Sequence, residues 1–196
     1  MDTPRPLWSA AAEPWRNGGG ITRQLAARDG NWRVSLAHIE QDGPYSRFEG
    51  MLRTSIVVCG EGVTLRYQDT TVELSPFLPA SYDGDQEWIA RLHKGAVKAL
   101  NVMVRKSKYQ ATIHPVPEHV VVPPGSTAVV VALERAASYA IDGTAVRGVV
   151  RPGFWITLSD FSRPLQIAPV ITEGEVSMRN TIILVNIETI RKEHSN

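Results

Sequence analysis

The chain has 196 residues and a formal net charge of +1, and 43% of its residues are hydrophobic. A chain of this length can bury a substantial core, either in one large domain or in two small ones. Because positive and negative charges nearly balance, the composition argues against nucleic acid or an anionic membrane as a partner. The single cysteine, Cys59, excludes an intramolecular disulfide framework.

Hydropathy gives no sign of a membrane segment. The longest apolar run, residues 128–133, is too short to cross a bilayer. The first twelve residues lack the basic start and the apolar centre of a signal peptide. We therefore expect a cytoplasmic protein without a membrane partner.

Short β-rich segments separated by Gly, Pro, Asp and Asn run from end to end, and no long amphipathic helix is indicated. Asp29-Gly30 is a strong hairpin signal between two of these segments. The pattern predicts an all-β protein built as sandwiches or barrels. The predicted strands are residues 21–28, 32–40, 51–59, 63–67, 71–74, 88–92 and 97–105, with a final strand at 181–190.

A glycine-rich stretch near the N-terminus is the most distinctive local motif. It reads Trp15-Arg16-Asn17-Gly18-Gly19-Gly20-Ile21-Thr22-Arg23. No lysine follows the glycines as in a P-loop, and the motif lacks the strand before and the helix after that a dinucleotide fingerprint requires. Glycines between two guanidinium groups favour a site for a planar anion. The alternative is a plain turn whose arginines cap backbone carbonyls.

Alternation along two predicted strands places polar groups among small residues. Arg33 and Ser35 share one face of the strand at 32–40, and Arg53 and Ser55 share one face of the strand at 51–59. Such a face is what the wall of a pocket would present, although a solvated edge would have a similar pattern.

The second part of the chain repeats the first. Residues 53–72 align with residues 127–146 without a gap, and Pro76-Phe77 then matches Pro152-Gly153-Phe154 after a short insertion. We interpret this repeat as two similar β-domains in tandem. The predicted boundaries are an N-terminal domain at 1–105, a proline-rich linker at 106–124 and a C-terminal domain at 125–196. The last strand should pair back onto the assembly, and residues 191–196 should form a frayed tail.

The two copies differ in polarity. The alignment sets Thr127 and Val129 at the positions of Arg53 and Ser55, so the polar positions of the first copy become uncharged in the second. It also sets Leu133 opposite Cys59, which predicts a thiol in the core. A pocket should therefore belong to the N-terminal half.

The motifs together resemble those of the HutD/Ves family. The resemblance rests on residues 14–23, 32–37, 42–44, 46–48, 84–85 and 100–103, together with Gly50 and Arg53. It implies a bicupin, with two cupin-like (RmlC-like jelly-roll) β-barrels in tandem. It also implies a cytoplasmic protein associated with histidine utilisation, with a regulatory or ligand-binding role.

Cupin enzymes commonly bind a metal through two histidines one residue apart, an acid and a later histidine. The five histidines of this chain do not have that spacing. We expect neither a metal nor another cofactor. Nucleophilic catalysis is also disfavoured, because there is no Gly-x-Ser-x-Gly turn and Cys59 lies in an apolar strand.

The arginines make the better case for a site. A guanidinium that faces a cavity needs a partner, which is either a ligand carboxylate or a protein acid such as Glu40, Asp42 or Asp85. We predict that Arg53 anchors the carboxylate and that backbone N–H groups of the glycine turn close over the ligand. The predicted ligand-binding residues are Arg16, Asn17, Gly18, Gly19, Gly20, Thr22, Arg23, Ser35, Arg53, Asp85 and Asn101.

The leading hypothesis is a small-molecule binding protein that regulates histidine utilisation. From the family resemblance, urocanate and formylglutamate are the candidate ligands. The alternative is a metal-free isomerase or hydrolase of a similar carboxylate, using the acids at 83–87 and His93. The sequence is also compatible with a homodimer.

Overall fold

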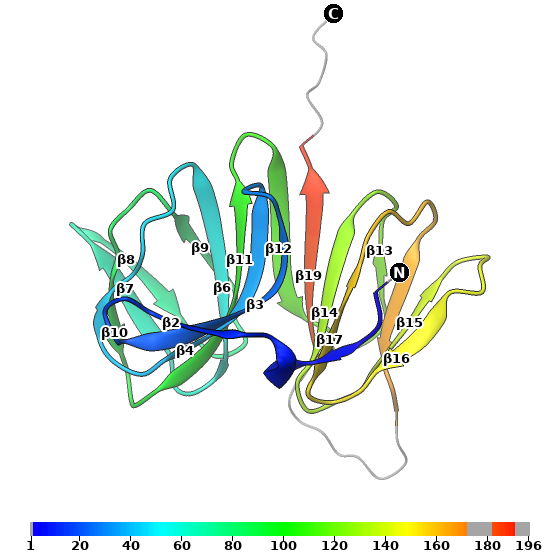
Figure 1. The fold of residues 1–196 in the computed structure, drawn as a ribbon, viewed down its shortest axis with the longest axis horizontal. Coiled ribbons are helices and arrows are strands. Elements are labelled where there is room, and N and C mark those ends of the chain that lie inside the picture. Colours follow the sequence, from blue (N-terminus) through cyan, green and yellow to red (C-terminus); the bar gives the residue numbers. More distant parts are fainter. Residues whose placement is uncertain (1, 172–181, 191–196) are drawn as a thin grey trace, which may run out of the picture.

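The computed structural model describes residues 2–171 and 182–190, and it is built from β-strands (Figure 1). Within these ranges the helical structure is limited to one short 3-10 helix, η1 (Leu7–Ser9). The strands form four sheets of antiparallel pairs, two sheets in each half of the molecule. The prediction of an all-β protein is confirmed.

The N-terminal half consists of a six-stranded sheet and a four-stranded sheet. The large sheet has the order β2 (Ala12–Pro14), β3 (Gly20–Arg28), β4 (Trp32–Ile39), β11 (Val97–Arg105), β6 (Met51–Cys59), β9 (Ala80–Asp83). The small sheet has the order β5 (Gly43–Pro44), β10 (Ile89–Leu92), β7 (Val63–Tyr67), β8 (Thr70–Leu74). The predicted strands at 51–59, 63–67 and 97–105 have the predicted bounds.

The C-terminal half consists of a five-stranded sheet and a four-stranded sheet. The large sheet has the order β1 (Arg5–Pro6), β17 (Phe154–Leu158), β14 (Thr127–Ala132), β19 (Ile182–Thr189), β12 (Tyr109–Pro115). The small sheet has the order β13 (Val120–Val122), β18 (Leu165–Pro169), β15 (Ala137–Ile141), β16 (Arg147–Val150). The last strand pairs back as predicted, between β14 and β12.

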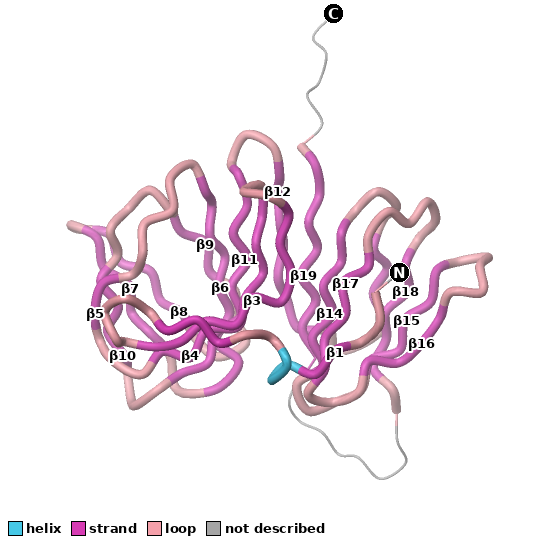
Figure 2. The backbone as a smooth tube through the Cα atoms, viewed as in Figure 1, coloured by secondary structure: helices cyan, strands magenta, loops and turns pink. Residues whose placement is uncertain are grey.

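The four sheets are stacked in layers, with the two large sheets back to back in the centre and the small sheets outside (Figures 1 and 2). Three apolar clusters fill the spaces between the layers. One packs Val34, Ile56 and Val102 of the first large sheet against Val131 and Val185 of the second. The other two lie inside the two halves. The two halves therefore share a continuous hydrophobic interface, which hydrophobic burial stabilises.

Both halves have the same strand order. The succession β4-β11-β6-β9 matches β12-β19-β14-β17, and β5-β10-β7-β8 matches β13-β18-β15-β16. The turns agree as well: the N–H of Phe77 donates to the carbonyl of Val57, and the N–H of Gly153 donates to the carbonyl of Ala132. Both residues have positive φ, 59° and 79°. The repeat predicted from the sequence is therefore present in the fold. No sheet closes on itself within the described ranges, so each half is a pair of open, facing sheets.

The gapless alignment is wrong by one residue on the first aligned strand. On β6, Arg53 lines the interior of its half and Val57 packs in the core there. On β14, Ala128, Val130 and Ala132 face the interior of the C-terminal half, whereas Val129 and Val131 face the central interface. Thr127 and Val129 are therefore not the counterparts of Arg53 and Ser55. Because side chains alternate along a strand, a slip of one residue exchanges the two faces.

The predicted domain boundaries also need correction. Residues 106–124 do not form a simple linker, because they contain β12 and β13, which belong to the two C-terminal sheets. Their prolines lie at or beyond strand ends, as at Pro115 and Pro123, where a missing N–H does not interrupt the pairing. At the other end of the chain, β1 pairs with β17, with Arg5 opposite Trp155. The first residues therefore complete the C-terminal large sheet.

Smaller differences concern Cys59 and the loop at 78–87. Cys59 ends β6 and is exposed, so the prediction of a core thiol is wrong. No strand is predicted between residues 74 and 88, but the structure has β9 there. The tail predicted at 191–196 lies outside the described residues. In the described part of the chain, no helix is long and apolar enough to cross a membrane.

Candidate functional site

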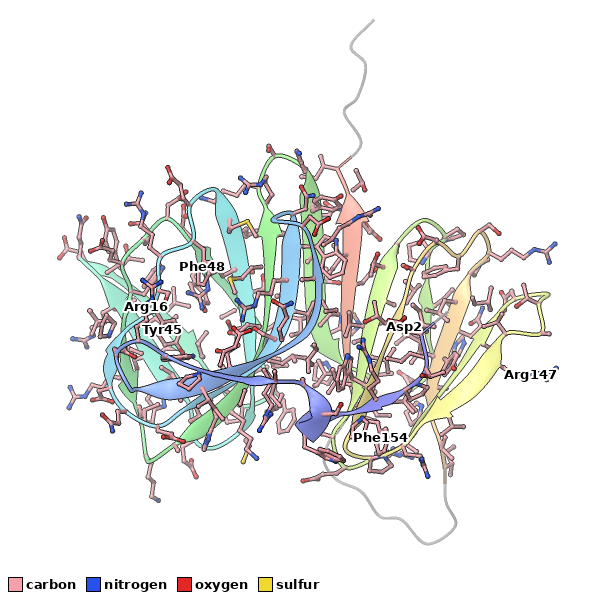
Figure 3. All side chains as sticks on the ribbon, in the orientation of Figure 1. Asp2, Arg16, Tyr45, Phe48, Arg147 and Phe154 are labelled. Carbon is pink, nitrogen blue, oxygen red and sulfur yellow. The ribbon has the colours of Figure 1, made fainter. Side chains whose placement is uncertain are left out.

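A pocket of about 480 Å³ opens in the N-terminal half, on the inner face of the six-stranded sheet. The segments that line it are β2 and the turn after it, the strands β3, β4, β6 and β11, and the loop after β5. Its lining residues are Glu13, Pro14, Trp15, Arg16, Thr22, Arg33, Ser35, Ala37, Tyr45, Ser46, Phe48, Arg53, Asn101 and Met103. In Figure 3, the labelled Arg16, Tyr45 and Phe48 lie over the N-terminal half, away from Arg147 and Phe154 of the other half.

Strand register sets the inner surface of this pocket. Met103 on β11 is paired with Arg33 of β4 on one side and with Arg53 of β6 on the other. The next inward row is Ser35, Asn101 and Ser55 on the same three strands. Residues directly opposite in a sheet share a face, so these two rows present two guanidinium groups beside a band of small polar groups.

Arg53 is buried to 6% exposure and has no acidic partner among the described residues. Its guanidinium carbon lies 5.1 Å from the ring centre of Tyr45, 5.3 Å from that of Phe48 and 4.9 Å from that of Tyr82. One N–H donates to the carbonyl of Ser46 at 3.2 Å, while its buried Nε has no partner. The negative faces of the rings attract the guanidinium cation, but the rings do not accept conventional hydrogen bonds from its N–H groups.

The polar row beneath Arg53 is internally hydrogen-bonded. Ser55 Oγ is paired with Tyr82 Oη at 2.9 Å and with Asn101 Oδ1 at 2.5 Å, and Asn101 Nδ2 donates to the carbonyl of Ala99. Ser55 is fully buried, and Asn101 is buried to 6% exposure. The network fixes the orientation of these groups, which is what a preorganised pocket base requires.

Arg33 is a second cation of the pocket, and its side chain is only partly buried. Its side chain is 25% exposed, and one Nη lies 3.5 Å from the Glu13 carboxylate on β2. The Glu13 side chain is itself 61% exposed. The buried Nε of Arg33, like that of Arg53, has no hydrogen-bond partner.

Tyr45 contributes a neutral hydroxyl to the pocket. Burial is the main reason why its pKa lies far above the ordinary value, with Tyr82 raising it further and the nearby Arg53 lowering it. Its ring packs edge-on against Trp15 at 5.6 Å. A phenol held neutral can donate a hydrogen bond but is a poor base at neutral pH.

The glycine turn has a structural role next to the pocket. The N–H of Gly18 donates to Trp15, and the N–H of Gly19 donates to the side chain of Asn17, whose amide donates to Pro44. A Cβ on Gly20 would lie 2.3 Å from the carbonyl oxygen of His38, so only glycine allows this approach of β3 to β4. The N–H groups of Gly18 and Gly19 are therefore engaged by the protein, contrary to the expectation that they close over a ligand. None of these glycines, nor Asn17, lines the pocket.

The other predicted residues are divided between the pocket and its surroundings. Arg16, Thr22, Ser35, Arg53 and Asn101 line the pocket. Thr22 accepts a hydrogen bond from the indole N–H of Trp15 at 2.7 Å.

Arg23 and Asp85 lie outside it. Arg23 donates to the carbonyls of Trp8 and Ala10 and thereby fastens the N-terminal segment. Asp85 accepts from the N–H of Gly50 and from Lys106, which also contacts Asp83. The hydrogen bond from Lys106, followed by that from Gly50, holds the pKa of Asp85 below its ordinary value.

The donor set of the pocket does not suit a metal. Among the described residues, no three His, Cys, Asp or Glu side chains gather in a way that could hold an ion. His38 Nδ1 lies 3.1 Å from Glu40 Oε1, and neither residue lines the pocket. Where a metal-binding cupin carries imidazoles and carboxylates, this chain has guanidinium, hydroxyl and amide groups, which do not fit a metal.

Sequence reasoning missed the aromatic residues and Glu13. Tyr45 and Phe48 lie in the loop after β5, and Tyr82 lies on β9, a strand that the sequence pattern does not predict. The alternation that identified Arg53 could not identify them, because loop residues have no period. Met103 could have been found, since it lies on the same strand face as the predicted Asn101.

Curated relatives match about half of the chain. A protein described as an uncharacterised 21.2 kDa protein in the hutC 3′ region of Pseudomonas putida is 31% identical over 107 residues, which covers 51% of this chain. Protein Ves of Escherichia fergusonii is 34% identical over 109 residues, which covers 50%. The aligned region spans 56% of the length of each relative.

Solved structures resemble the whole fold. A conserved protein of unknown function from Pseudomonas aeruginosa PAO1 has a TM-score of 0.81 at 21% identity, covering 96% of this chain and 99% of that one. HutD from Pseudomonas fluorescens SBW25, described in a formate condition, has a TM-score of 0.76 at 18% identity, with coverage of 96% and 99%.

A cupin 2 conserved barrel domain protein from Leptotrichia buccalis has a TM-score of 0.57 at 12% identity, covering 96% of each chain. These likenesses show a cupin-type fold. The HutD family model matches residues 9–152, which is well over half of the chain, and the chain therefore belongs to the HutD family.

Proposed function

We propose that this protein binds a small carboxylate in its N-terminal pocket, with Arg53 as the anchor, and acts as a ligand-responsive regulator of histidine utilisation. The observation that carries the proposal is the state of Arg53, which is buried among three aromatic rings without a carboxylate partner. An isolated buried charge is costly, and a bidentate carboxylate would offset that cost.

The lining of the pocket supports binding over catalysis. Its only carboxylate among the described residues is the exposed Glu13, it contains no histidine, and Tyr45 stays protonated. An isomerase or hydrolase needs a positioned base and acid, and this lining offers neither at its centre. Asp83, Asp85 and His93, which the enzyme alternative would use, do not line the pocket.

The link to histidine utilisation rests on the names of relatives, HutD and a protein of the hutC 3′ region. Urocanate and formylglutamate are carboxylates of the size that such a pocket could take, and they remain our candidate ligands. The cupin-like likeness and the shared strand order of the two halves further support a bicupin in which one unit binds ligand and the other is filled.

Calorimetric titration of the purified protein tests the proposal. Wild type, Arg53→Ala and Arg53→Lys are titrated with urocanate, formylglutamate and formate. Truncating a shielded guanidinium that pairs with a carboxylate costs about 2–5 kcal/mol, so Arg53→Ala should weaken binding by roughly thirtyfold or more. Arg53→Lys should recover only part, because an ammonium lacks the planar fork.

Arg66→Ala is the matched control, since it removes the same charge from an exposed position on β7 outside the pocket. It should bind as wild type does. If Arg53→Ala binds the best ligand as tightly as wild type, or if no small carboxylate binds wild type, the proposal is wrong.

A further inference from the structure

We infer that Arg33 forms a second anion subsite, so that the pocket selects dicarboxylates, and that Glu13 occupies this subsite until the ligand displaces it. The inference rests on the proposed function and specifies its ligand class.

The first observation is the placement of the two arginines. They stand in one row of the same sheet face, on either side of Met103, and both line the same pocket. With one strand between them, their Cα atoms are about two strand spacings apart, roughly 9.5 Å. Two long side chains on such a row can engage two ends of one small molecule.

The second observation is that both guanidinium groups have unused donors. The Nε of Arg33 and the Nε of Arg53 are each buried without a hydrogen-bond partner among residues 2–171 and 182–190. A buried N–H without an acceptor is destabilising, and the two lie at one cavity. One monocarboxylate can satisfy the fork of only one arginine.

The third observation is the charge of the lining. Arg16, Arg33 and Arg53 face a single acid, Glu13, which leaves an excess of two positive charges among the lining residues. Once Glu13 is displaced, the lining presents three positive charges, and a dicarboxylate offsets more of this charge than a monocarboxylate does. A monocarboxylate leaves the guanidinium of Arg33 dependent on an exposed glutamate.

Glu13 is well placed to be displaced. It lies on β2, a three-residue edge strand that pairs only with β3. Its contact with Arg33, at 3.5 Å, is longer than the 2.7–2.9 Å of a strong charge-assisted bond. Because its side chain is 61% exposed, its carboxylate can return to water at little cost. Glu13 thus acts as an internal substitute for the second carboxylate.

The test compares glutarate with its monomethyl ester, which has the same length and one charge fewer, by calorimetry on the full chain. In wild type, glutarate should bind at least about tenfold more tightly than the ester. In Arg33→Met this preference should fall to about twofold or less, while ester affinity stays within about threefold of wild type. Malonate, succinate and adipate, each against its monomethyl ester, extend the comparison to other lengths.

Glu13→Gln provides a second measurement that leaves the core intact. Removing a partly solvated competing carboxylate should tighten glutarate binding by about two- to fivefold and should raise the preference for glutarate over the ester. Arg66→Met is the control for loss of a positive charge and should preserve the preference.

The outcomes separate the inference from the proposed function. If no diacid of the series is preferred over its ester in wild type, or if the preference survives Arg33→Met, the second subsite is wrong. In that case a loss of ester binding in Arg53→Ala would still support the proposed function. If neither diacids nor esters bind wild type, both are wrong.

Discussion

The two halves of this molecule share a strand order but differ in what fills their interiors. In the C-terminal half, the inward positions of the large sheet include Ala128, Val130, Ile156, Leu158 and Leu184, all fully buried and apolar. In the N-terminal half, the corresponding face carries two arginines, two serines and an asparagine around a pocket. One topology therefore supports a filled core in one copy and a polar cavity in the other. The strand order specifies the scaffold, and the inward side chains specify whether it can bind.

This comparison predicts that interior residues serve stability in one half and binding in the other. The tests below measure the free energy of unfolding by chemical denaturation, in descending order of the expected change.

The largest change should follow Ile156→Ala in the C-terminal half. Ile156 is fully buried in the apolar cluster between the two C-terminal sheets. Removing its side chain should lower the free energy of unfolding by about 2–5 kcal/mol, because apolar burial is lost and a cavity remains. Ligand affinity of the folded variant should not change. A loss below about 1 kcal/mol would show that this interior is not the tight core we describe.

A moderate change is expected for Ser55→Ala in the N-terminal half. The substitution leaves the buried Tyr82 hydroxyl and the Asn101 carbonyl oxygen without their shared partner. An unsatisfied buried polar group costs about 1–3 kcal/mol, and we expect a loss of that size. Ser107→Ala, at an exposed position in the turn after β11, serves as the control. If the variant is as stable as wild type, the hydrogen bonds of Ser55 to Tyr82 and Asn101 do not contribute to the stability of the fold.

A smaller, pH-dependent change should come from His114 on β12. Its partial burial lowers its pKa below the ordinary value of 6.5. The unfolded chain then binds a proton more readily than the folded one as the pH falls below about 6.5, so protonation favours unfolding. The stability that the neutral imidazole allows is present above this pH and is lost as the pH falls toward the folded pKa.

The measurement is the free energy of unfolding at pH 7.5 and pH 5.5 in wild type and in His114→Gln. The loss between the two pH values should be larger in wild type. An equal loss in both proteins would show that His114 does not contribute.

The smallest change in the free energy of unfolding is expected at Arg53, the residue whose replacement should reduce ligand affinity most. Replacing a buried, unpaired guanidinium by an apolar side chain of similar length is often neutral or stabilising. Arg53→Met should therefore change the free energy of unfolding by no more than about 1 kcal/mol, while it abolishes carboxylate binding. A loss above about 3 kcal/mol would show that Arg53 is needed for the stability of the N-terminal half. In that case the interior of this half would serve stability as well as binding, and the difference that we describe between the two halves would be wrong.

Much of this architecture follows from the sequence alone. Turn residues and β-rich runs predicted the all-β class, and strand alternation predicted that Ser35 and Arg53 share polar faces that could line a pocket. The repeated order of strands and turns predicted two similar halves. These inferences succeed because the pleat and the turn chemistry are local properties of the chain.

The register of the repeat could not be read in the same way. All six residues of β14 are buried, since the strand lies between the C-terminal core and the central interface. A strand buried on both faces has no apolar–polar alternation, so the sequence contains no signal for which residues face inward. The boundary at β12 is hidden for a different reason, because the strand that pairs with it, β19, lies far along the chain.

The composition of the pocket was decided by tertiary contacts. Only the folded chain brings Tyr45, Phe48 and Tyr82, from two loop positions and an unpredicted strand, around the guanidinium of Arg53. It also engages the glycine turn in backbone pairing and brings Glu13 to Arg33. The sequence determined which strand faces are polar, because that follows from a period of two. Which groups meet across the cavity depends on long-range strand pairing, which no local pattern specifies.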